Sequence, residues 1–268
     1  MELVIAYHAE RFRHHVEFPA LIESLIKRYY PKNKKLDLTL RDNSLEIWAP
    51  DLNEMTSPVT KLCLLRYLKF KDLFVAKNSI SNAKEFAGLN LRRLYLQHTQ
   101  ITDLLPLLSI ATLDRVTIQH DQIPQEQLAE FSKHFTKDLV QVYEAEDAIH
   151  THKVKANYNH RNYTSGGFVD GFYKNPNGII SFKLQAKQTG IETIRFRYSA
   201  GFGDADIIII TNDKEQEFTL KSTRTWEEWG TALITIDLKQ GKNVLSFKMK
   251  TSTHKCFNLD SISRPLKN

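Results

Sequence analysis

Apolar residues recur at regular intervals in the first half of the chain. One set of four apolar positions occurs three times, as Phe70, Leu73, Val75 and Ile80, as Leu91, Leu94, Leu96 and Ile101, and as Leu113, Val116, Ile118 and Ile123. The copies are 21 and 22 residues apart, a period typical of stacked repeat units. Each unit is expected to supply a short parallel strand and a returning segment. Because no unit can bury its apolar face alone, neighbouring units must stack.

An earlier copy precedes these three. The segment 38–45 matches the segment 73–80 at an offset of 35 residues, so one unit carries an insertion around residues 49–61. Asn43 and Asn78 stand where an asparagine bonds the backbone of the turn in such repeats, whereas the later copies carry other residues there. In its period this half of the chain resembles the short bacterial leucine-rich repeats, a family that usually binds proteins. The resemblance implies an α/β solenoid.

Two amphipathic helices are predicted at the ends of this solenoid. The segment 18–30 has apolar residues at helical spacing, a proline in its first turn and Pro31 after its end. The segment 125–135 has a similar pattern. Both are expected to cover repeat ends that would otherwise expose their core. The predicted boundary therefore separates a repeat domain, residues 1–137, from a second domain, residues 138–268.

The repeat strands are predicted to expose one column of side chains between their buried leucines. Phe74, Arg93, Tyr95 and Arg115 lie in neighbouring rows of this column. Aromatic side chains beside arginines are typical of protein-binding surfaces, although every solenoid exposes some residues on this face. The repeats are therefore expected to hold a protein partner or to act as a spacer.

The second half consists of short alternating segments punctuated by Gly and Asn, which is typical of an antiparallel β-sandwich. Glu144 and Glu146 are two residues apart and face the same way if that stretch is a strand. Asp260 arrives from the last strand. Three oxygen ligands at one end of a sandwich suit Ca²⁺ better than they suit catalysis. These residues predict a calcium site, completed by the loop at residues 157–164.

Five ordered landmarks of this half resemble carbohydrate-binding module families six and thirty-five. They are the YEAED segment 143–147, the segment GGFVDG at 166–171, the strand 194–201, the WEEW segment 226–229 and the closing Asn258-x-Asp260. The resemblance covers about residues 139–265. It implies a jelly-roll, galactose-binding-like β-sandwich with a structural Ca²⁺ that ties the first and last strands together.

The resemblance also implies a glycan site in the loops at one end of the sandwich. Sugar recognition needs aromatic faces for the C–H side of a pyranose ring and polar groups for its hydroxyls. The matching positions are Phe168 or Phe172, Trp226 and Asn258, with Lys255 and His254 at the rim. Core packing is the alternative for each aromatic residue, and it is the preferred interpretation for Trp229.

The sequence contains no nucleophile elbow and no glycine-rich phosphate loop. Asp204 and Asp206 form an acidic pair in a loop, but paired carboxylates hydrolyse glycosides only in a cleft that holds the sugar chain. We therefore expect a non-catalytic, lectin-like carbohydrate-binding protein. The alternative is a protein-interaction scaffold whose sandwich has lost its sugar site. A hydrolase or lyase would require a cleft between the two domains.

Composition adds few constraints. The formal net charge is +6, with 41% hydrophobic residues, as in an ordinary globular protein. The basic run 32–35 is expected to be a solvated turn, so neither nucleic acid nor membrane is a predicted partner. The first ten residues do not read as a signal peptide. This indicates a cytoplasmic location for the chain as written, unless it derives from an exported protein.

Overall fold

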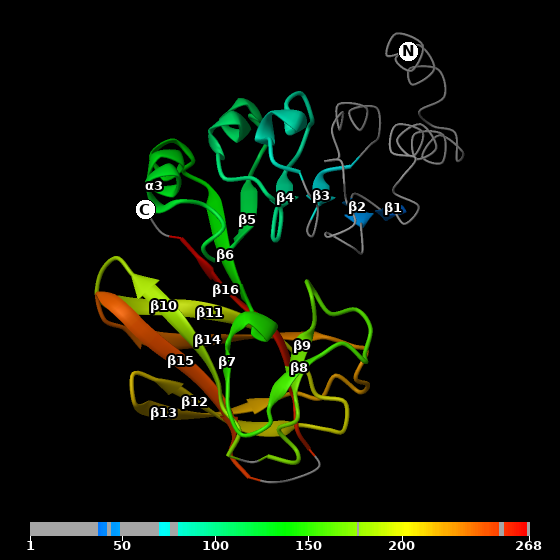
Figure 1. Cartoon of the computed structure of the whole chain (residues 1–268), viewed down its shortest axis with the longest axis vertical. Helices are drawn as coiled ribbons and strands as arrows, with labels where there is room; N and C mark the ends of the chain where they lie inside the picture. The colour runs from blue at the N-terminus through cyan, green and yellow to red at the C-terminus, as the bar shows by residue number, and fades with distance from the viewer. Residues whose placement is uncertain are drawn as a thin grey trace. The chain divides into compact units, whose positions relative to one another are not determined.

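The computed structural model describes residues 37–41, 44–48, 70–75, 80–175, 177–251 and 255–266. The chain divides into two compact units (Figure 1). Unit 1 comprises Met1–Gln141 and Pro265–Asn268, and unit 2 comprises Val142–Arg264. The boundary after Gln141 lies four residues beyond the predicted boundary after residue 137. In contrast to the prediction, the last residues of the chain, Pro265–Asn268, belong to unit 1. Among the described residues, no helix is long and apolar enough to cross a membrane.

Four neighbouring strands of unit 1 pair in parallel. They are β2 (Ser44–Trp48), β3 (Asp72–Phe74), β4 (Arg93–Tyr95) and β5 (Arg115–Gln119). Leu73 lies opposite Leu94, which lies opposite Val116, and all three side chains are fully buried. The predicted spacings of 21 and 22 residues are thus confirmed, because residues separated by these intervals lie opposite each other in neighbouring strands.

The alignment of the earliest copy was wrong. Strand β1 (Asp37–Arg41) pairs antiparallel with β2, so the two form a hairpin. As a result Leu45, and not Leu38, lies opposite Leu73. Leu38 and Leu45 both lie in segments where apolar and polar residues alternate. The pattern alone therefore did not show which of the two strands continues the parallel sheet. The predicted insertion at 49–61 lies outside the described residues.

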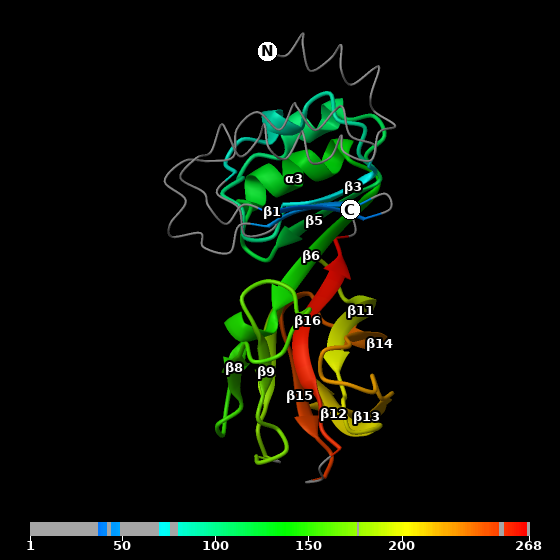
Figure 2. The same ribbon diagram turned by 90° about the vertical axis from the view of Figure 1, so that its right-hand side faces the viewer.

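The returning segments of unit 1 are helical and lie on one side of the strands (Figures 1 and 2). They are the 3₁₀ helices η2 (Ala83–Phe86) and η3 (Leu105–Ser109) and the α-helix α3 (Gln125–His134). The Asn82 side chain caps η2 by accepting a hydrogen bond from the Lys84 N–H. Helix α3 confirms the predicted second helix, whereas residues 18–30 lie outside the described part of the chain.

Unit 2 is a β-sandwich, as predicted. One sheet has the order β6-β16-β11-β14, with β9 paired to β16 and β8 to β9. Its strands are β6 (Asp138–Glu144), β16 (Asn258–Pro265), β11 (Gly190–Ser199), β14 (Gly230–Leu238), β9 (Phe168–Asp170) and β8 (Lys155–Asn157). A 3₁₀ turn, η4 (Ala145–Asp147), follows β6.

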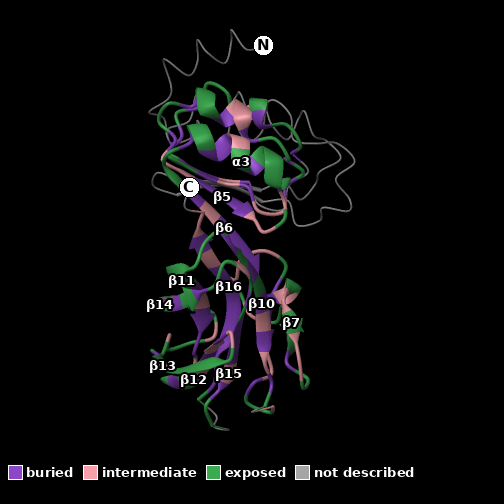
Figure 3. Cartoon of the chain, turned by 90° about the vertical axis from the view of Figure 1, so that its left-hand side faces the viewer, coloured by how far each residue is buried: buried purple, intermediate pink, exposed green. Residues whose placement is uncertain are grey.

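The second sheet has the order β13-β12-β15-β10-β7. Its strands are β13 (Lys214–Leu220), β12 (Ala205–Thr211), β15 (Gly241–Met249), β10 (Ile180–Ala186) and β7 (Ile149–His150). Buried residues alternate with more exposed ones along strands such as β10 and β12 (Figure 3), as expected for a sandwich core. Phe196 and Phe247 meet there with ring centroids 5.3 Å apart. Burial of each such side chain contributes about 2 kcal/mol to folding, and this core holds the end loops in place.

The pairing of β11 with β16 shifts register between Arg197 and Tyr198. Such a bulge bends a strand and redirects its side chains. Here it lies beside Asp260, which is the third residue of β16 and is fully buried. The bulge therefore lies where a charged side chain is buried within this sheet.

Candidate functional site

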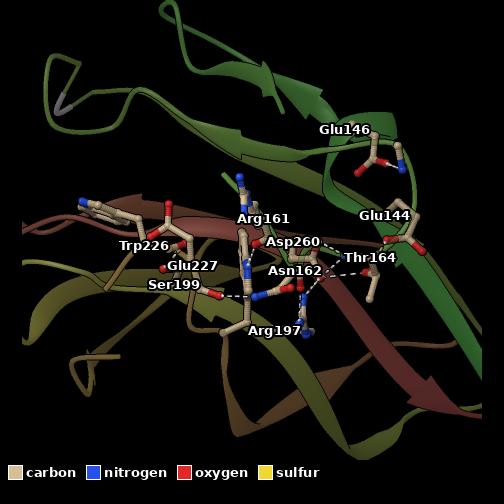
Figure 4. Close-up of polar contacts among 12 residues, drawn as sticks. Glu144, Glu146, Arg161, Asn162, Thr164, Arg197, Ser199, Trp226, Glu227 and Asp260 are labelled. Atoms are coloured by element: carbon tan, nitrogen blue, oxygen red, sulfur yellow. Dashed lines mark hydrogen bonds and ion pairs between the residues drawn. The ribbon is translucent and has the colours of Figure 1, made fainter. Parts of the chain in front are cut away.

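A buried carboxylate network surrounds Asp260 (Figure 4). The Arg197 Nη1 donates to Asp260 Oδ2 at 2.5 Å. The Thr164 backbone N–H donates to Oδ1 at 2.9 Å, and the Thr164 hydroxyl donates to Oδ2 at 2.7 Å. The same hydroxyl lies 3.5 Å from Glu144 Oε2. Thr164 therefore joins two of the three predicted calcium ligands.

The third predicted ligand, Glu146, is held at a neighbouring position on η4. Its Oε1 accepts a hydrogen bond from the Gly166 N–H at 2.7 Å. Its Oε2 is buried and accepts no hydrogen bond from a described residue. Burial raises the pKa of Glu146 to about 7, and the negative charges of Asp147 and Asp260 act in the same direction.

Carboxylate oxygens such as these are the ligands that Ca²⁺ prefers. Burial also raises the pKa of Asp260, because desolvation outweighs the opposing effect of Arg197. Arg197 pairs with Asp260, whereas Glu146 keeps a buried oxygen without a described donor, which is costly unless an ion or a donor reaches it. The described side chains do not, however, already converge as a group of three or more metal ligands.

Arg197 connects this network to the loops at the end of the sandwich. Its Nη2 donates to the Asn162 carbonyl at 2.7 Å, and its guanidinium lies 5.1 Å from the centre of the Trp229 ring. Trp229 in turn donates from Nε1 to the Arg161 carbonyl at 2.8 Å. The Trp229 ring thus connects two loops and is only half-buried, whereas the sequence interpretation placed it in the core.

Trp226 lies in the loop before β14, and its half-buried side chain is beside the end of β11. The Ser199 hydroxyl donates to the Trp226 carbonyl at 3.2 Å, and Ser199 pairs with Asn258 of β16. Trp226 and Asn258 therefore lie at the same end of the sandwich. Among the described residues, no hydrogen bond is formed by the Asn258 side chain, which is 5% exposed.

The turn that follows β11 lies beneath Trp226. A Cβ atom at Gly201 would lie 2.7 Å from the indole ring, so the ring rests on bare backbone. Phe202 meets this ring edge-on, with centroids 5.3 Å apart and planes at 82°. On the other side of Phe202, a Cβ at Gly203 would lie 3.6 Å from the Lys255 side chain. The predicted residues Trp226, Asn258 and Lys255 are thus gathered around one turn.

Two predicted ligand-binding residues must be corrected. Phe168 and Phe172 are both fully buried, so neither ring offers a face to a sugar. Phe168 packs against Trp229, and Phe172 stacks on Phe257 with centroids 4.3 Å apart. Their positions next to loops gave no indication of burial, and both serve the core.

Phe202, Gly201 and His160 are candidate site residues that the sequence prediction missed. Phe202 is 66% exposed, and its position between two glycines in a turn is a signal that could have indicated it. The His160 ring lies nearly parallel to Trp226 at 5.9 Å, and its Nδ1 is 3.3 Å from Glu227 Oε1. His160 therefore helps to fix the orientation of the indole.

Gly201→Ala tests the positioning of Trp226. The added methyl group meets the centre of the indole rather than the end of a flexible side chain, so the ring must move. We expect changed tryptophan fluorescence and nearly unchanged secondary structure by circular dichroism. Gly190→Ala is the matched control, because a Cβ at Gly190 meets no atom within 4 Å. Equal spectra for the two variants would contradict this packing.

The residues predicted to bind protein lie together in unit 1. Phe74 and Tyr95 stack with centroids 4.0 Å apart. Arg93 pairs with Asp72, and Arg115 pairs with Asp138. In unit 2, the acidic pair is engaged elsewhere: Asp204 binds Lys221 and Asp206 accepts from Thr219.

Comparison with known proteins places these features in context. No protein-family model matches the chain. It is 34% identical over 122 residues to an isomaltosyltransferase of Sporosarcina globispora, covering 45% of this chain and 11% of that protein. It is 36% identical over 122 residues to a cycloisomaltooligosaccharide glucanotransferase of Niallia circulans, covering 45% of this chain and 12% of that protein.

The chain thus spans only about a tenth of the length of these relatives. Among solved structures, it is similar to a family 35 carbohydrate-binding module from Clostridium thermocellum. The identity is 26% and the TM-score 0.44, covering 46% of this chain and 95% of that one.

Proposed function

We propose that unit 2 is a non-catalytic carbohydrate-binding module whose site is formed by Trp226, Phe202, Asn258 and Lys255. The observation that carries this proposal is the Trp226 ring held flat on Gly201, beside an exposed Phe202. Aromatic rings held in this way suit the C–H face of a pyranose. The Asn258 amide carries both donors and an acceptor, but the residue is 5% exposed, so in this proposal the amide must turn outward to meet a sugar hydroxyl.

The named activities of the relatives suggest which sugar to test first. Those proteins are called an isomaltosyltransferase and a cycloisomaltooligosaccharide glucanotransferase, so isomalto-oligosaccharides are the first candidate ligands. Few groups contribute to the site, and binding must offset the lost freedom of the sugar. We therefore expect weak affinity.

We further propose that Glu144, Glu146 and Asp260 hold a structural Ca²⁺. The ion would supply positive charge beside these three carboxylates, and carboxylate oxygens are its preferred ligands. Glu146 Oε2, which accepts no hydrogen bond from a described residue, supports this assignment. Thr164 lies against two of these carboxylates, so the ion would also steady the loop that precedes β9.

For unit 1 we propose a leucine-rich-repeat type of solenoid, supported by the parallel register of β2 to β5. Its role would be to hold a protein partner or to set spacing. The rival hypothesis is a protein-interaction scaffold whose sandwich binds no sugar. The burial of Phe168 and Phe172 favours this rival, because it leaves fewer aromatic residues for a glycan.

Calorimetric titration of the full chain with isomalto-oligosaccharides, in the presence of Ca²⁺, separates the two hypotheses. We expect saturable binding that Trp226→Ala weakens at least about fivefold, since stacking on one aromatic ring is worth on the order of 1 kcal/mol or more. Ile191→Ala is the control, because this apolar residue is as exposed as Phe202, at 66%, and begins β11 at the opposite end from Ser199. If neither this series nor a broad glycan array binds the folded protein, the scaffold is favoured.

A further inference from the structure

Unit 1 carries a charged pocket on the strand face opposite its helices. Its volume is about 460 Å³. The cations of its wall are Lys71, Arg92, Arg93 and Arg115, and its acids are Asp72, Asp114 and Asp138. Four cations against three carboxylates leave one positive charge, and Lys137 adds a second at the edge through its contact with Asp114.

Each carboxylate of the wall already has an arginine partner from a neighbouring strand. Arg93 holds Asp72 through Nε and Nη2, and Arg115 holds Asp138 through the same pair of nitrogens. Arg92 donates from Nε to Asp114 at 2.7 Å. These contacts fix the arginine side chains and leave other guanidinium N–H groups available, because a guanidinium has five N–H donors.

The arginines remain accessible although they are paired. Their side chains are between 30% and 60% exposed. Lys71 is exposed and forms no ion pair with a described residue. A carboxylate that enters the pocket would therefore meet Lys71 and arginines that are already oriented. Its binding would cost the protein little conformational freedom.

An apolar platform lies next to this pocket on the same face. Phe74 and Tyr95, stacked and half-buried, come two residues after Asp72 and Arg93 on their strands. Two residues of a strand span about 7 Å, which is also the distance between alternate side chains of an extended peptide. The surface thus matches an acidic side chain followed, two positions on, by an apolar one.

We infer that this face of unit 1 binds an extended acidic segment of a protein partner, with a carboxylate in the pocket and an apolar side chain on the Phe74–Tyr95 pair. A polyphosphate chain such as nucleic acid fits less well, because three carboxylates of the wall would repel closely spaced phosphates. The inference extends the role proposed for unit 1 and does not depend on sugar binding by unit 2.

Fluorescence anisotropy with labelled synthetic peptides tests this inference on the full chain. The probe repeats Glu-Thr-Leu, and its two controls repeat Lys-Thr-Leu and Glu-Thr-Ser. We expect the first peptide to bind and both controls to bind at least about tenfold more weakly. Added salt should weaken binding further, because the contacts are exposed.

The double variant Lys71→Gln/Arg92→Gln should lose about tenfold in affinity for the Glu-Thr-Leu peptide. It leaves Asp114 its contact with Lys137 and leaves the buried Asp72 untouched. Lys84→Gln is the control, since Lys84 lies on η2.

Equal binding of the Lys-Thr-Leu peptide, or no binding by a folded protein, would overturn the inference. Binding of an acidic polysaccharide in preference to the peptide would overturn the choice of partner. Titration with isomalto-oligosaccharides reports on unit 2 separately.

Discussion

Arg197→Met should destabilise unit 2 by about 3 to 5 kcal/mol, because removing one partner of a buried ion pair leaves an uncompensated charge. Asp260 is fully buried, and Arg197 is its only cationic partner among the described residues. Methionine keeps much of the apolar length of arginine, so the loss reports chiefly on charge. The variant also removes the contacts of Arg197 with the Asn162 carbonyl and with Trp229.

Urea unfolding followed by tryptophan fluorescence measures this loss. A Trp48→Phe background leaves Trp226 and Trp229 as the fluorophores, and both belong to unit 2. Arg195→Met is the matched control, since Arg195 is exposed on the same strand and should change stability by no more than about 0.5 kcal/mol. Addition of Asp260→Asn to Arg197→Met should recover part of the loss. Equal midpoints for the two arginine variants would show that Asp260 needs no cation.

The second large effect expected is a loss of stability as pH rises in the metal-free protein. Burial raises the pKa of Glu146 to about 7, above an ordinary glutamate pKa of about 4.3. Between these values the folded state binds more protons than the unfolded chain, so stability falls as pH rises and is lowest above pH 7. The loss is up to about 4 kcal/mol, since one pKa unit corresponds to about 1.4 kcal/mol.

Calcium should reverse this dependence if the proposed site is correct. The ion binds ionised carboxylates, so the stability that it adds should grow as pH rises from about 5 to 7.5. Unfolding curves at these two pH values, with chelator and with Ca²⁺, provide the measurement. Glu146→Gln should remove most of the pH dependence in chelator. A wild-type protein whose midpoint is indifferent to Ca²⁺ at pH 7.5 would rule out the proposed site.

The sequence predicted the elements whose pattern is strong and local. The 21- and 22-residue spacing predicted the register of Leu73, Leu94 and Val116, and the apolar periodicity at 125–135 predicted α3. Alternation and turn residues predicted the sandwich. In each case one apolar face has a single way to be buried, so pattern and packing agree.

The predictions that failed depended on tertiary context. Leu38 and Leu45 both occupy plausible strand positions, and only the β1–β2 hairpin decides that Leu45 faces Leu73. Phe168 and Phe172 flank turns as a surface aromatic would, and their burial depends on Trp229 and Phe257, which are distant in sequence. Likewise, no local pattern indicated that Arg197 would pair with Asp260.

Strand β16 also constrains the order in which the protein can form during synthesis. It lies between β6 and β11, inside the sheet rather than at its edge, and it carries Asn258 and Asp260. Because domains fold from the N-terminus as the chain emerges, the repeats of unit 1 can assemble while the sandwich still lacks this interior strand. Unit 2 can close only after residues 258–264 have left the ribosome. The proposed glycan and calcium sites would therefore form only after β16 has emerged, and nascent chains would display unit 1 before they could bind sugar.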